Sequence, residues 1–330
     1  MKICHFIASS LFGGAEKVVG NLCNEMSREH EVHFITFDTP GHMKHIANNV
    51  QIHYFREFKR YNIFASWKLA KLINEISPDI IHTHGAKSTR IVYNIRHFIH
   101  AAFVGTKHNA RRGKIFNRIN HVIAVSREAA RSIKSDHVKV IYNGIEPIGI
   151  ADDETKDDVF HILAVGRLDK IKAFDILIRE CAKLTFPFLL QIVGEGSERE
   201  ALERLIKSKK MESKVALIGF QKDIPQRMHH ADVVVMSSHS EGFSLVMVES
   251  LFYADIFLST KVSGATEILS DRFLCTHSTL AEKLNDIHLH QKVYRDAFAQ
   301  LKEKSKGQFL LHHVAKEHIE YYHEILEEKQ

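Results

Sequence analysis

Cysteine is scarce in this chain of 330 residues, which contains only four. The four lie far apart in the sequence and none belongs to a C-x-x-C pair, so the sequence indicates neither a disulfide framework nor a cysteine-based zinc site. A reducing compartment, the cytoplasm, is therefore expected. The residues are Cys4, Cys23, Cys181 and Cys275.

Long apolar runs are also lacking. No stretch approaches the ~18 to 20 apolar residues that a membrane-spanning helix needs. The N-terminal stretch MKICHFIASSLFGGA contains a lysine, apolar residues and small residues, as a secretory signal does. However, His5, Ser9 and Ser10 interrupt its apolar part, and the residues that follow read as a strand-to-helix turn. We expect neither a membrane span nor a secretory signal.

The charges are unevenly distributed. Residues 1–145 contain 21 Lys and Arg against 10 Asp and Glu, whereas residues 146–330 contain 24 against 30. The first part is strongly basic and the second mildly acidic, although the whole chain carries only +5. Such a split predicts that the basic half faces an anionic partner.

Length and composition favour two globular domains. At 45% hydrophobic and 26% charged residues, the composition is that of a soluble globular protein. A length of 330 residues also exceeds the size at which one hydrophobic core keeps growing. Two cores of ordinary size are therefore expected.

The order of apolar runs along the sequence also indicates two domains. Short β-rich runs alternate with amphipathic helical stretches from KICHFIAS to HVIAVS, where Ser126 is a candidate N-cap, and again from HILAVGR to ADVVVMSS. This alternation is typical of α/β domains with parallel sheets. An acidic stretch at 151–159 lies at or just past the linker. We predict domains at 1–147 and 148–310, and a long C-terminal helix at 311–330 that packs back on the first domain.

Two cations follow the first strand of the second half, in GRLDKIK (166–172). Arg167 and Lys172 then lie in a loop at the carboxyl end of a strand. Ligands of open α/β sheets bind outside that edge, and two cations at this spacing are suited to a diphosphate. A pair of solvated surface cations is the alternative interpretation.

A glycine-containing turn, GEGS, follows the next strand. Gly194 and Gly196 flank Glu195, but Arg199 stands where the dinucleotide-binding motif G-x-G-x-x-G has its third glycine. The turn therefore argues against a nicotinamide cofactor. The glycines still allow a ligand to approach the backbone closely.

The stretch SEGFSLVMVESLF (240–252) reads as a loop and a helix that begins near Ser244. Glu241 and Gly242 then lie just before the helix N-terminus, whose free N–H groups and dipole favour phosphate. Glu249 falls in the second turn, and helical side chains lean toward the N-terminus, so its carboxylate could reach a ribose beside that phosphate. The two glutamates are expected to contact different parts of one ligand.

The order of these motifs resembles that of a known family. GRLxxxK, GEG, LIGF and EGFSLVMVE, preceded by GGAE, TKHN, AVS and YNGI, are similar to the landmarks of the retaining nucleotide-sugar glycosyltransferases of family four, over almost the whole chain. The resemblance implies the GT-B fold, in which two Rossmann-like, doubly wound domains face a central cleft. It also implies metal-independent transfer, with retention, from a nucleoside-diphosphate sugar to a glycan or glycolipid acceptor.

The resemblance also suggests where such an enzyme works. UDP is the commonest nucleotide of the family, and a short bacterial-looking enzyme with a basic half suggests lipopolysaccharide, capsule or another surface glycan. We therefore expect a cytoplasmic protein at the inner face of the cytoplasmic membrane, with no metal and no other cofactor.

Roles for individual residues follow from the same resemblance. In the second half, Arg167 and Lys172 would bind the donor diphosphate, Glu249 the ribose and Glu241, as a catalytic residue, the transferred sugar. Further donor contacts are implied for Gly196, for Phe220 near the base, and for the backbone of Gly242, Phe243, Ser244 and Leu245.

In the first half, the resemblance implies two further site residues. Gly14 would let the backbone approach the donor phosphate or the acceptor, although a tight turn alone would also explain it. His108, in TKHN, would contact the transferred sugar as the second catalytic residue.

Histidines in DIIHTHG raise the question of a metal. His82 and His84 lie on one side of an extended chain, as metal ligands would. No third ligand is indicated and the family uses no metal, so we expect no metal site and place both residues in the lining of the cleft.

Basic residues mixed with aromatic ones continue through KSTRIVYNIRHFIH and TKHNARRGKIFNR. Such a patch suits anionic lipid head groups or a phosphorylated glycolipid acceptor, while a merely solvated basic face is the alternative. No motif supports nucleic-acid binding. The residues assigned to the patch are Lys107, Arg111, Arg112 and Lys114.

The chain departs from the family at three places and leaves two other functions open. Ala173 and Ser263 stand where glycine is common, and the segment after Asp271 is short and lacks the usual glycine. These departures concern the sugar pocket rather than the nucleotide site. A GT-B epimerase or phosphorylase would share the architecture, but would need no sugar acceptor or would use phosphate. A non-catalytic partner subunit would more often have lost Arg167, Lys172 or Glu249, and all three are present.

Overall fold

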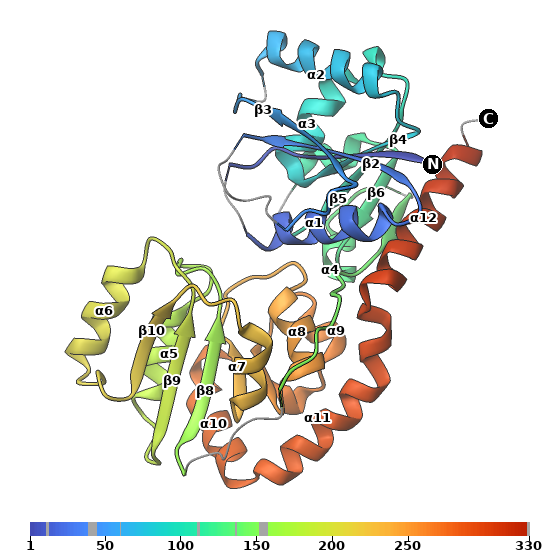
Figure 1. The fold of residues 1–330 in the computed structure, drawn as a ribbon. Coiled ribbons are helices and arrows are strands. Elements are labelled where there is room, and N and C mark those ends of the chain that lie inside the picture. Colours follow the sequence, from blue (N-terminus) through green and yellow to red (C-terminus); the bar gives the residue numbers. More distant parts are fainter. Residues whose placement is uncertain are drawn as a thin grey trace. The chain divides into compact units, whose positions relative to one another are not determined.

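The computed structural model describes residues 1–10, 13–38, 45–59, 61–110, 113–135, 137–151 and 158–328. It divides into two compact units (Figure 1). Unit 1 comprises Met1–Glu146 and Phe309–Gln330, and unit 2 comprises Pro147–Gln308. The C-terminal segment therefore returns to the unit in which the chain begins.

Unit 1 is built on a parallel sheet in the order β3-β2-β1-β4-β5-β6-β7. The order reverses between β1 and β4, which pair in parallel with His5 opposite His82. Such a switch point is where open α/β sheets bind ligands. The strands are β1 (Lys2–Ile7), β2 (Glu31–Phe37), β3 (Gln51–Phe55), β4 (Ile80–His84), β5 (Ala102–Lys107), β6 (His121–Ala124) and β7 (Val138–Val140).

Helices cover both faces of this sheet. In Figure 1, α2 and α3 lie on one side of the sheet and α1 and α12 on the other. As predicted, Ser126 caps a helix, since its side chain accepts a hydrogen bond from the Ala129 N–H, although that helix is short. The helices are α1 (Gly14–Met26), α2 (Ile63–Ile76), α3 (Gly85–Ile95), α4 (Arg127–Arg131) and α12 (Leu311–Glu327), with 3-10 turns at Arg96–Phe98 and Lys114–Arg118.

The period of two along each strand decides which side chains meet which helices. In β1, Cys4 and Phe6 pack into an apolar cluster with Leu69 of α2 and Ile91 of α3. His5, between them, therefore points to the opposite face of the sheet, toward α1 and α12. The histidines of β4 lie on that face too, so alternation alone gathers them there.

Unit 2 has a six-stranded parallel sheet in the order β10-β9-β8-β11-β12-β13. Its strand order also reverses, between β8 and β11, which sets the carboxyl ends of these two strands side by side. The strands are β8 (Phe160–Val165), β9 (Phe188–Val193), β10 (Val215–Gly219), β11 (Val233–Met236), β12 (Phe257–Thr260) and β13 (Leu274–Cys275).

Helices also connect the strands of unit 2. They are α5 (Phe174–Cys181), α6 (Arg199–Ser208), α7 (Ile224–His230), α8 (Leu245–Tyr253), α9 (Ala265–Ile268), α10 (Leu280–Leu289) and α11 (Gln291–Ser305), with 3-10 turns at Asp271–Phe273, His277–Thr279 and Lys306–Phe309. Among the residues that the structure describes, no helix combines the length and the apolar character needed to cross a membrane. The four thiols are free and buried, and burial raises the pKa of each, that of Cys275 to about 12.

Candidate functional site

The loop after β8 is shaped by one carboxylate. Asp169 Oδ1 accepts hydrogen bonds from the backbone N–H groups of Ile171, at 3.0 Å, and of Lys172, at 3.2 Å. Its Oδ2 pairs with Arg167 Nε at 2.7 Å. Asp169 thereby folds the loop and holds the largely exposed Arg167 guanidinium at the carboxyl end of the sheet.

An ion pair joins this loop to the one after β11. Lys172 Nζ lies 2.7 Å from Glu241 Oε1, and both side chains are mostly buried. Ser238 Oγ donates to the same carboxylate oxygen at 2.6 Å, and Ser237 Oγ donates to the Lys172 carbonyl at 2.8 Å. Because the pair is partly desolvated and braced from both sides, its ammonium and carboxylate have fixed positions.

The helix that follows Glu241 offers a phosphate-binding terminus. Helix α8 begins at Leu245, and the N-cap residue Ser244 makes no side-chain capping hydrogen bond. The first-turn N–H groups of any α-helix lack partners within the helix, and their dipole attracts anions. Glu249 lies in the second turn of α8, as the sequence predicts, and it is buried.

Glycines bring two backbone segments of this site close together. A Cβ at Gly194, where φ is +140°, would lie 1.9 Å from the Gly166 carbonyl oxygen, and one at Gly196 would lie 2.3 Å from the Leu168 carbonyl oxygen. The two turns after β8 and β9 therefore pack backbone to backbone. This packing requires Gly196 whether or not a ligand approaches it.

Backbone angles differ between the two residues that stand where glycine is common, Ala173 and Ser263. Ala173 has φ +52°, a conformation that glycine adopts more easily than alanine. In the pair Ser263-Gly264, the glycine is kept at the position that has φ +77° and faces Gly242 and Phe243. Of these two residues, only Ala173 has a positive φ.

Two phenylalanines predicted to contact the donor differ in how far they are exposed. Phe220, after β10, leaves most of its ring exposed, whereas Phe243 is buried. An exposed ring is available for stacking on a base. Phe243 can contribute only its backbone to a ligand, which is the role that the sequence predicts for it.

Unit 1 contains a continuous row of histidines. His5 Nδ1 hydrogen-bonds with His84 Nε2 at 3.0 Å, and His84 Nδ1 hydrogen-bonds with His108 Nε2 at 3.2 Å. Beside this row, His82 Nδ1 bonds to the Tyr322 hydroxyl at 2.6 Å and His82 Nε2 to the Thr106 hydroxyl at 2.5 Å. The row ends at His108, at the carboxyl end of β5.

These imidazoles are neutral near pH 7. Burial lowers the pKa of His5 to about 3, and burial together with neighbouring His318 lowers the pKa of His108 to about 4. Burial also lowers the pKa of His318 to about 4 and those of His82 and His84 well below the usual range. Each ring therefore has one N–H donor and one acceptor nitrogen.

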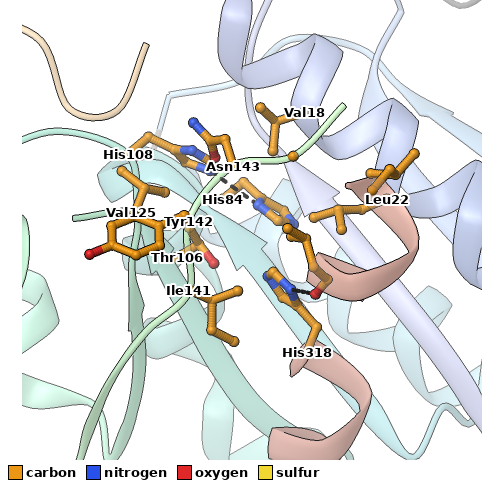
Figure 2. Close-up of a pocket in the computed structure, with 13 residues that line it drawn as sticks. Val18, Leu22, His84, Thr106, His108, Val125, Ile141, Tyr142, Asn143 and His318 are labelled. Atoms are coloured by element: carbon orange, nitrogen blue, oxygen red, sulfur yellow. Dashed lines mark hydrogen bonds between the residues drawn. The ribbon is translucent and has the colours of Figure 1, made fainter. Parts of the chain in front are cut away.

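A small cavity of about 10 Å³ lies beside this row. Its lining includes the polar residues His84, Thr106, His108, Tyr142, Asn143 and His318. Figure 2 shows His108, His84 and His318 following one another along its wall; His108 directly follows β5, His84 ends β4, and His318 comes from α12. The space is about that of one water molecule, so the substrate-sized part of any site lies elsewhere.

The predicted absence of a third histidine ligand is wrong for this face. His5, His82 and His84 present nitrogens that all lie within 4.8 Å of one another. Yet both nitrogens of His82 already bond to hydroxyl groups. His5 Nδ1 and His84 Nε2 point at each other, because the two nitrogens are 3.0 Å apart while the centres of the two rings are 5.3 Å apart. A metal would have to displace these bonds.

Other expectations for unit 1 need correction. Lys107, assigned to a surface patch, is only 2% exposed, because β5 points it inward and Nζ donates to Ser132 Oγ. His82 is fully buried and His84 nearly so, packed against other side chains rather than lining an open cleft. Lys114 is exposed at the start of a 3-10 turn.

The remaining predictions for unit 1 have different outcomes. Gly14 is the first residue of α1, and a Cβ there would meet no heavy atom within 4 Å, which leaves room for a ligand. Arg111 and Arg112 lie outside the described residues. The sequence reasoning missed His5, although the alternation of β1 and its pairing with β4 predict that it joins His82 and His84.

Two family profiles together match nearly the whole chain. The profile described as Glycosyltransferase Family 4 matches residues 12–147, and the profile described as Glycosyl transferases group 1 matches residues 150–304. The chain belongs to the family-four glycosyltransferases. The predicted family and the predicted enzyme class are thereby confirmed.

Two similar proteins are bacterial glycosyltransferases. An N-acetylgalactosamine-N,N'-diacetylbacillosaminyl-diphospho-undecaprenol 4-alpha-N-acetylgalactosaminyltransferase of Campylobacter jejuni is 37% identical over 145 residues, which are 42% of this chain and 40% of that enzyme. The match thus spans less than half of that relative. The lipopolysaccharide core biosynthesis glycosyltransferase LpsD of Rhizobium meliloti is 23% identical over 82% of this chain and 81% of its own length.

Solved structures confirm the predicted GT-B fold of the glycosyltransferase. Anabaena Alr3699/HepE, in complex with UDP and glucose, superposes with a TM-score of 0.86 at 19% identity, over 97% of this chain and 99% of that chain. Sucrose-phosphate synthase from Thermosynechococcus elongatus superposes with a TM-score of 0.85 at 18% identity, over 98% of both chains.

Proposed function

We propose that this glycosyltransferase transfers a sugar, with retention and without a metal, from a nucleoside-diphosphate sugar, most simply a UDP-sugar, to a glycan or glycolipid of the bacterial cell surface. The Lys172–Glu241 pair at the N-terminus of α8 is the observation that carries the proposal. It combines a fixed cation, a fixed carboxylate and a helix terminus at one edge of the sheet. These are the groups that an anionic donor requires.

The chemistry follows from where negative charge develops. Cleavage of the sugar–phosphate bond leaves a nucleoside diphosphate, and preorganised donors that meet the growing charge lower the barrier. Charge-assisted hydrogen bonds contribute roughly 1.5 to 3 kcal/mol each. Lys172, Arg167 and the amides of α8 are therefore proposed to stabilise the leaving group in place of a divalent cation.

Glu241 and His108 are assigned to the transferred sugar. Because Lys172 holds one carboxylate oxygen of Glu241, the other oxygen is oriented for a sugar hydroxyl. The neutral imidazole of His108 is assigned to a second hydroxyl, from unit 1. In the proposed front-side mechanism, the departing phosphate oxygen accepts the acceptor's proton, so neither residue needs to act as a nucleophile.

The names of relatives support a surface-glycan role. Both the Campylobacter enzyme above and a second Campylobacter relative, which is 22% identical over 98% of this chain, are named for diphospho-undecaprenol acceptors. LpsD is named for lipopolysaccharide core biosynthesis. A lipid-linked or lipopolysaccharide acceptor is therefore proposed here, with the enzyme acting at the inner face of the cytoplasmic membrane.

A donor panel tests the proposal. Purified protein is incubated with UDP-, GDP- and ADP-sugars and with a lipid-linked or lipopolysaccharide acceptor, with and without EDTA, and release of the nucleotide and the anomeric configuration of the product are followed by NMR. Turnover that persists in EDTA and a retained anomer are expected. Lys172→Met should abolish turnover, whereas Lys170→Met, an exposed lysine in the same loop, should not. Turnover with phosphate, or without any acceptor sugar, would instead indicate a phosphorylase or an epimerase.

A further inference from the structure

The N-terminal half of helix α2 exposes an unusual number of large apolar side chains. Ile63 is 80% exposed, Phe64 84%, and Trp67, the only tryptophan of the chain, 62%. Tyr61, just before the helix, is 70% exposed. Single exposed apolar residues are common, but four within seven positions form a patch of the kind that marks an interaction site.

The patch is not a by-product of an unfinished core. The opposite stripe of α2, at helical spacing, is buried against the sheet and α3, and includes Leu69, Ala70 and Ile73. The Asn62 side chain caps the helix by accepting a hydrogen bond from the Ala65 N–H at 3.0 Å. Because the first turn is fixed in this way, Ile63 and Phe64 are held outward.

Basic residues surround the apolar ones. Residues 56–71 contain five Lys and Arg and a single acidic residue, Glu57, which pairs with Lys87 at 3.1 Å. Lys68 and Lys71 follow Trp67 along the exposed face of α2, and Lys59 precedes Tyr61. An open hollow of about 660 Å³, lined by Lys59, Tyr61 and Lys87 among others, adjoins the patch.

We infer that this surface, Tyr61, Ile63, Phe64 and Trp67 with Lys59, Lys68 and Lys71, is the site at which unit 1 docks on an anionic lipid bilayer. Aromatic and aliphatic side chains enter the boundary between head groups and acyl chains, while lysines around them stay in the head-group layer. In Figure 1, α2 lies in the outer layer of unit 1, over one face of its sheet. This surface replaces Lys107, which is buried, in the predicted membrane contact.

Charge decides between a bilayer and other occupants. A second copy of this chain, related by symmetry, would bring the same lysines together, and like charges repel. The cores of protein interfaces are depleted in lysine, whereas anionic membranes attract it. The mixture of exposed aromatics and lysines thus fits a bilayer of negative charge best.

The single tryptophan makes the test direct. Vesicles of phosphatidylcholine with phosphatidylglycerol, and vesicles of phosphatidylcholine alone, are added to the full-length protein. Binding is measured by flotation, and Trp67 emission is recorded. We expect co-flotation with the anionic vesicles only, together with a blue shift of Trp67 emission as its ring leaves water.

Matched variants keep the proposal falsifiable. Ile63→Ser with Phe64→Ser should reduce binding about tenfold or more, and Lys68→Gln with Lys71→Gln should reduce binding and its dependence on anionic lipid. Leu289→Ser with Val293→Ser removes another exposed apolar pair, from unit 2, where the two residues are 74% and 53% exposed, and should leave binding unchanged.

Three outcomes would overturn the proposal: equal binding by all variants, an unshifted Trp67 emission, or concentration-dependent dimerisation that the Ile63/Phe64 change abolishes. The readout does not require sugar transfer, so it stands or falls separately from the proposed function.

The histidine row carries a second, independent inference. Two arrangements of protons satisfy the two hydrogen bonds of neutral His5, His84 and His108. In one, His5 and His84 each donate through Nδ1, and His108 keeps its proton on Nδ1. In the other, all three protons lie on Nε2, which leaves the His5 Nε2–H buried; this atom has no partner in the structure. A buried N–H without an acceptor is the rarer and costlier state.

We propose that His84 and His5 are positioning residues that fix the proton of His108 on Nδ1. His108 then presents an N–H donor, rather than an acceptor, to the sugar oxygen assigned to it above. The inference rests on the proposed function only for that last step. Second-layer histidine partners of this kind commonly set the tautomer of the residue that touches a ligand.

Imidazole ¹⁵N NMR reads this tautomer without any turnover. In the wild-type protein, His108 should be protonated at Nδ1. His84→Leu should give a mixture of His108 tautomers and lower kcat about tenfold or more, with KM little changed. His84→Gln, whose amide can donate to His108 Nε2, should keep the Nδ1-protonated tautomer and the wild-type kcat. A wild-type His108 protonated at Nε2, or an unchanged tautomer in His84→Leu, would refute the proposal. If His108 is protonated at Nδ1 but the wild-type protein transfers no sugar, the proposed function is wrong and the tautomer proposal still holds.

Discussion

Acid should destabilise unit 1 steeply, because its histidines are buried in the neutral state. An unfolded histidine has a pKa of 6.5, whereas burial lowers that of His5 to about 3 and those of His108 and His318 to about 4. Below pH 6.5 the unfolded chain therefore binds protons that the folded chain does not. The free energy of unfolding must fall as the pH falls from 6.5 toward these lowered values.

The magnitude follows from linkage. Each such side chain lowers the free energy of unfolding by about 1.4 kcal/mol per pH unit below its unfolded pKa. At about pH 5.5, the three histidines with values near 3 and 4 together remove about 4 kcal/mol, and His82 and His84 act in the same direction. Because whole domains are stable by only about 5 to 15 kcal/mol, this loss is large.

Hydrogen exchange during urea unfolding isolates the effect in unit 1. The amides of β1 and β4 are followed at about pH 7.5 and about pH 5.5, with exchange rates corrected for pH. His318→Gln should reduce the difference between the two conditions by about 1.4 kcal/mol, because one buried imidazole is removed. His97→Gln, at an exposed position, is the matched control and should not reduce it. A wild-type difference below about 1 kcal/mol would refute the reasoning.

Three further substitutions test unit 2 and the assigned roles. Glu249→Ala should raise the donor Kd by about tenfold or more, whereas His108→Ala should mainly lower kcat, and equally small effects of both would contradict the assignments. Gly194→Ala should destabilise unit 2 by about 3 kcal/mol or more, because its Cβ would overlap the Gly166 carbonyl at a φ that alanine avoids, and a near-wild-type urea midpoint would contradict this. Ala173→Gly should raise the stability of unit 2 by up to about 1 kcal/mol, since glycine relieves the positive φ, and a clear loss would show that the strain is negligible.

The sequence predicted both sheets because hydrophobic periodicity is a local property. Runs such as HILAVGR and ADVVVMSS are buried strands, and the stretch after Glu241 is the helix α8 that begins one residue after Ser244. The order of motifs was sufficient to predict the family. What the pattern could not give was the direction of a single side chain at the end of a strand, which is why Lys107 was wrongly assigned to a surface patch.

Residue types also failed to predict which polar groups share a network. The sequence indicated Lys172 and Glu241 as separate ligand contacts, but not that the two pair with each other and with Ser238. Residue numbers 69 positions apart carry no such information, because the pairing depends on β8 and β11 being neighbours in the sheet. The role of Asp169 in shaping its loop was also missed, although its partners Arg167, Ile171 and Lys172 are close to it in the sequence.

By itself, the sequence determined the alternation of strands and helices, the division into two α/β series and the motifs at the strand ends, since these depend on local composition and spacing. Only the tertiary structure decided that His5, His84 and His108 form one hydrogen-bonded row, that Lys107 is buried, and that the apolar residues at the start of α2 remain on the surface. These facts depend on which elements pack together. The sequence of a helix with two apolar sides does not show which side the fold will bury.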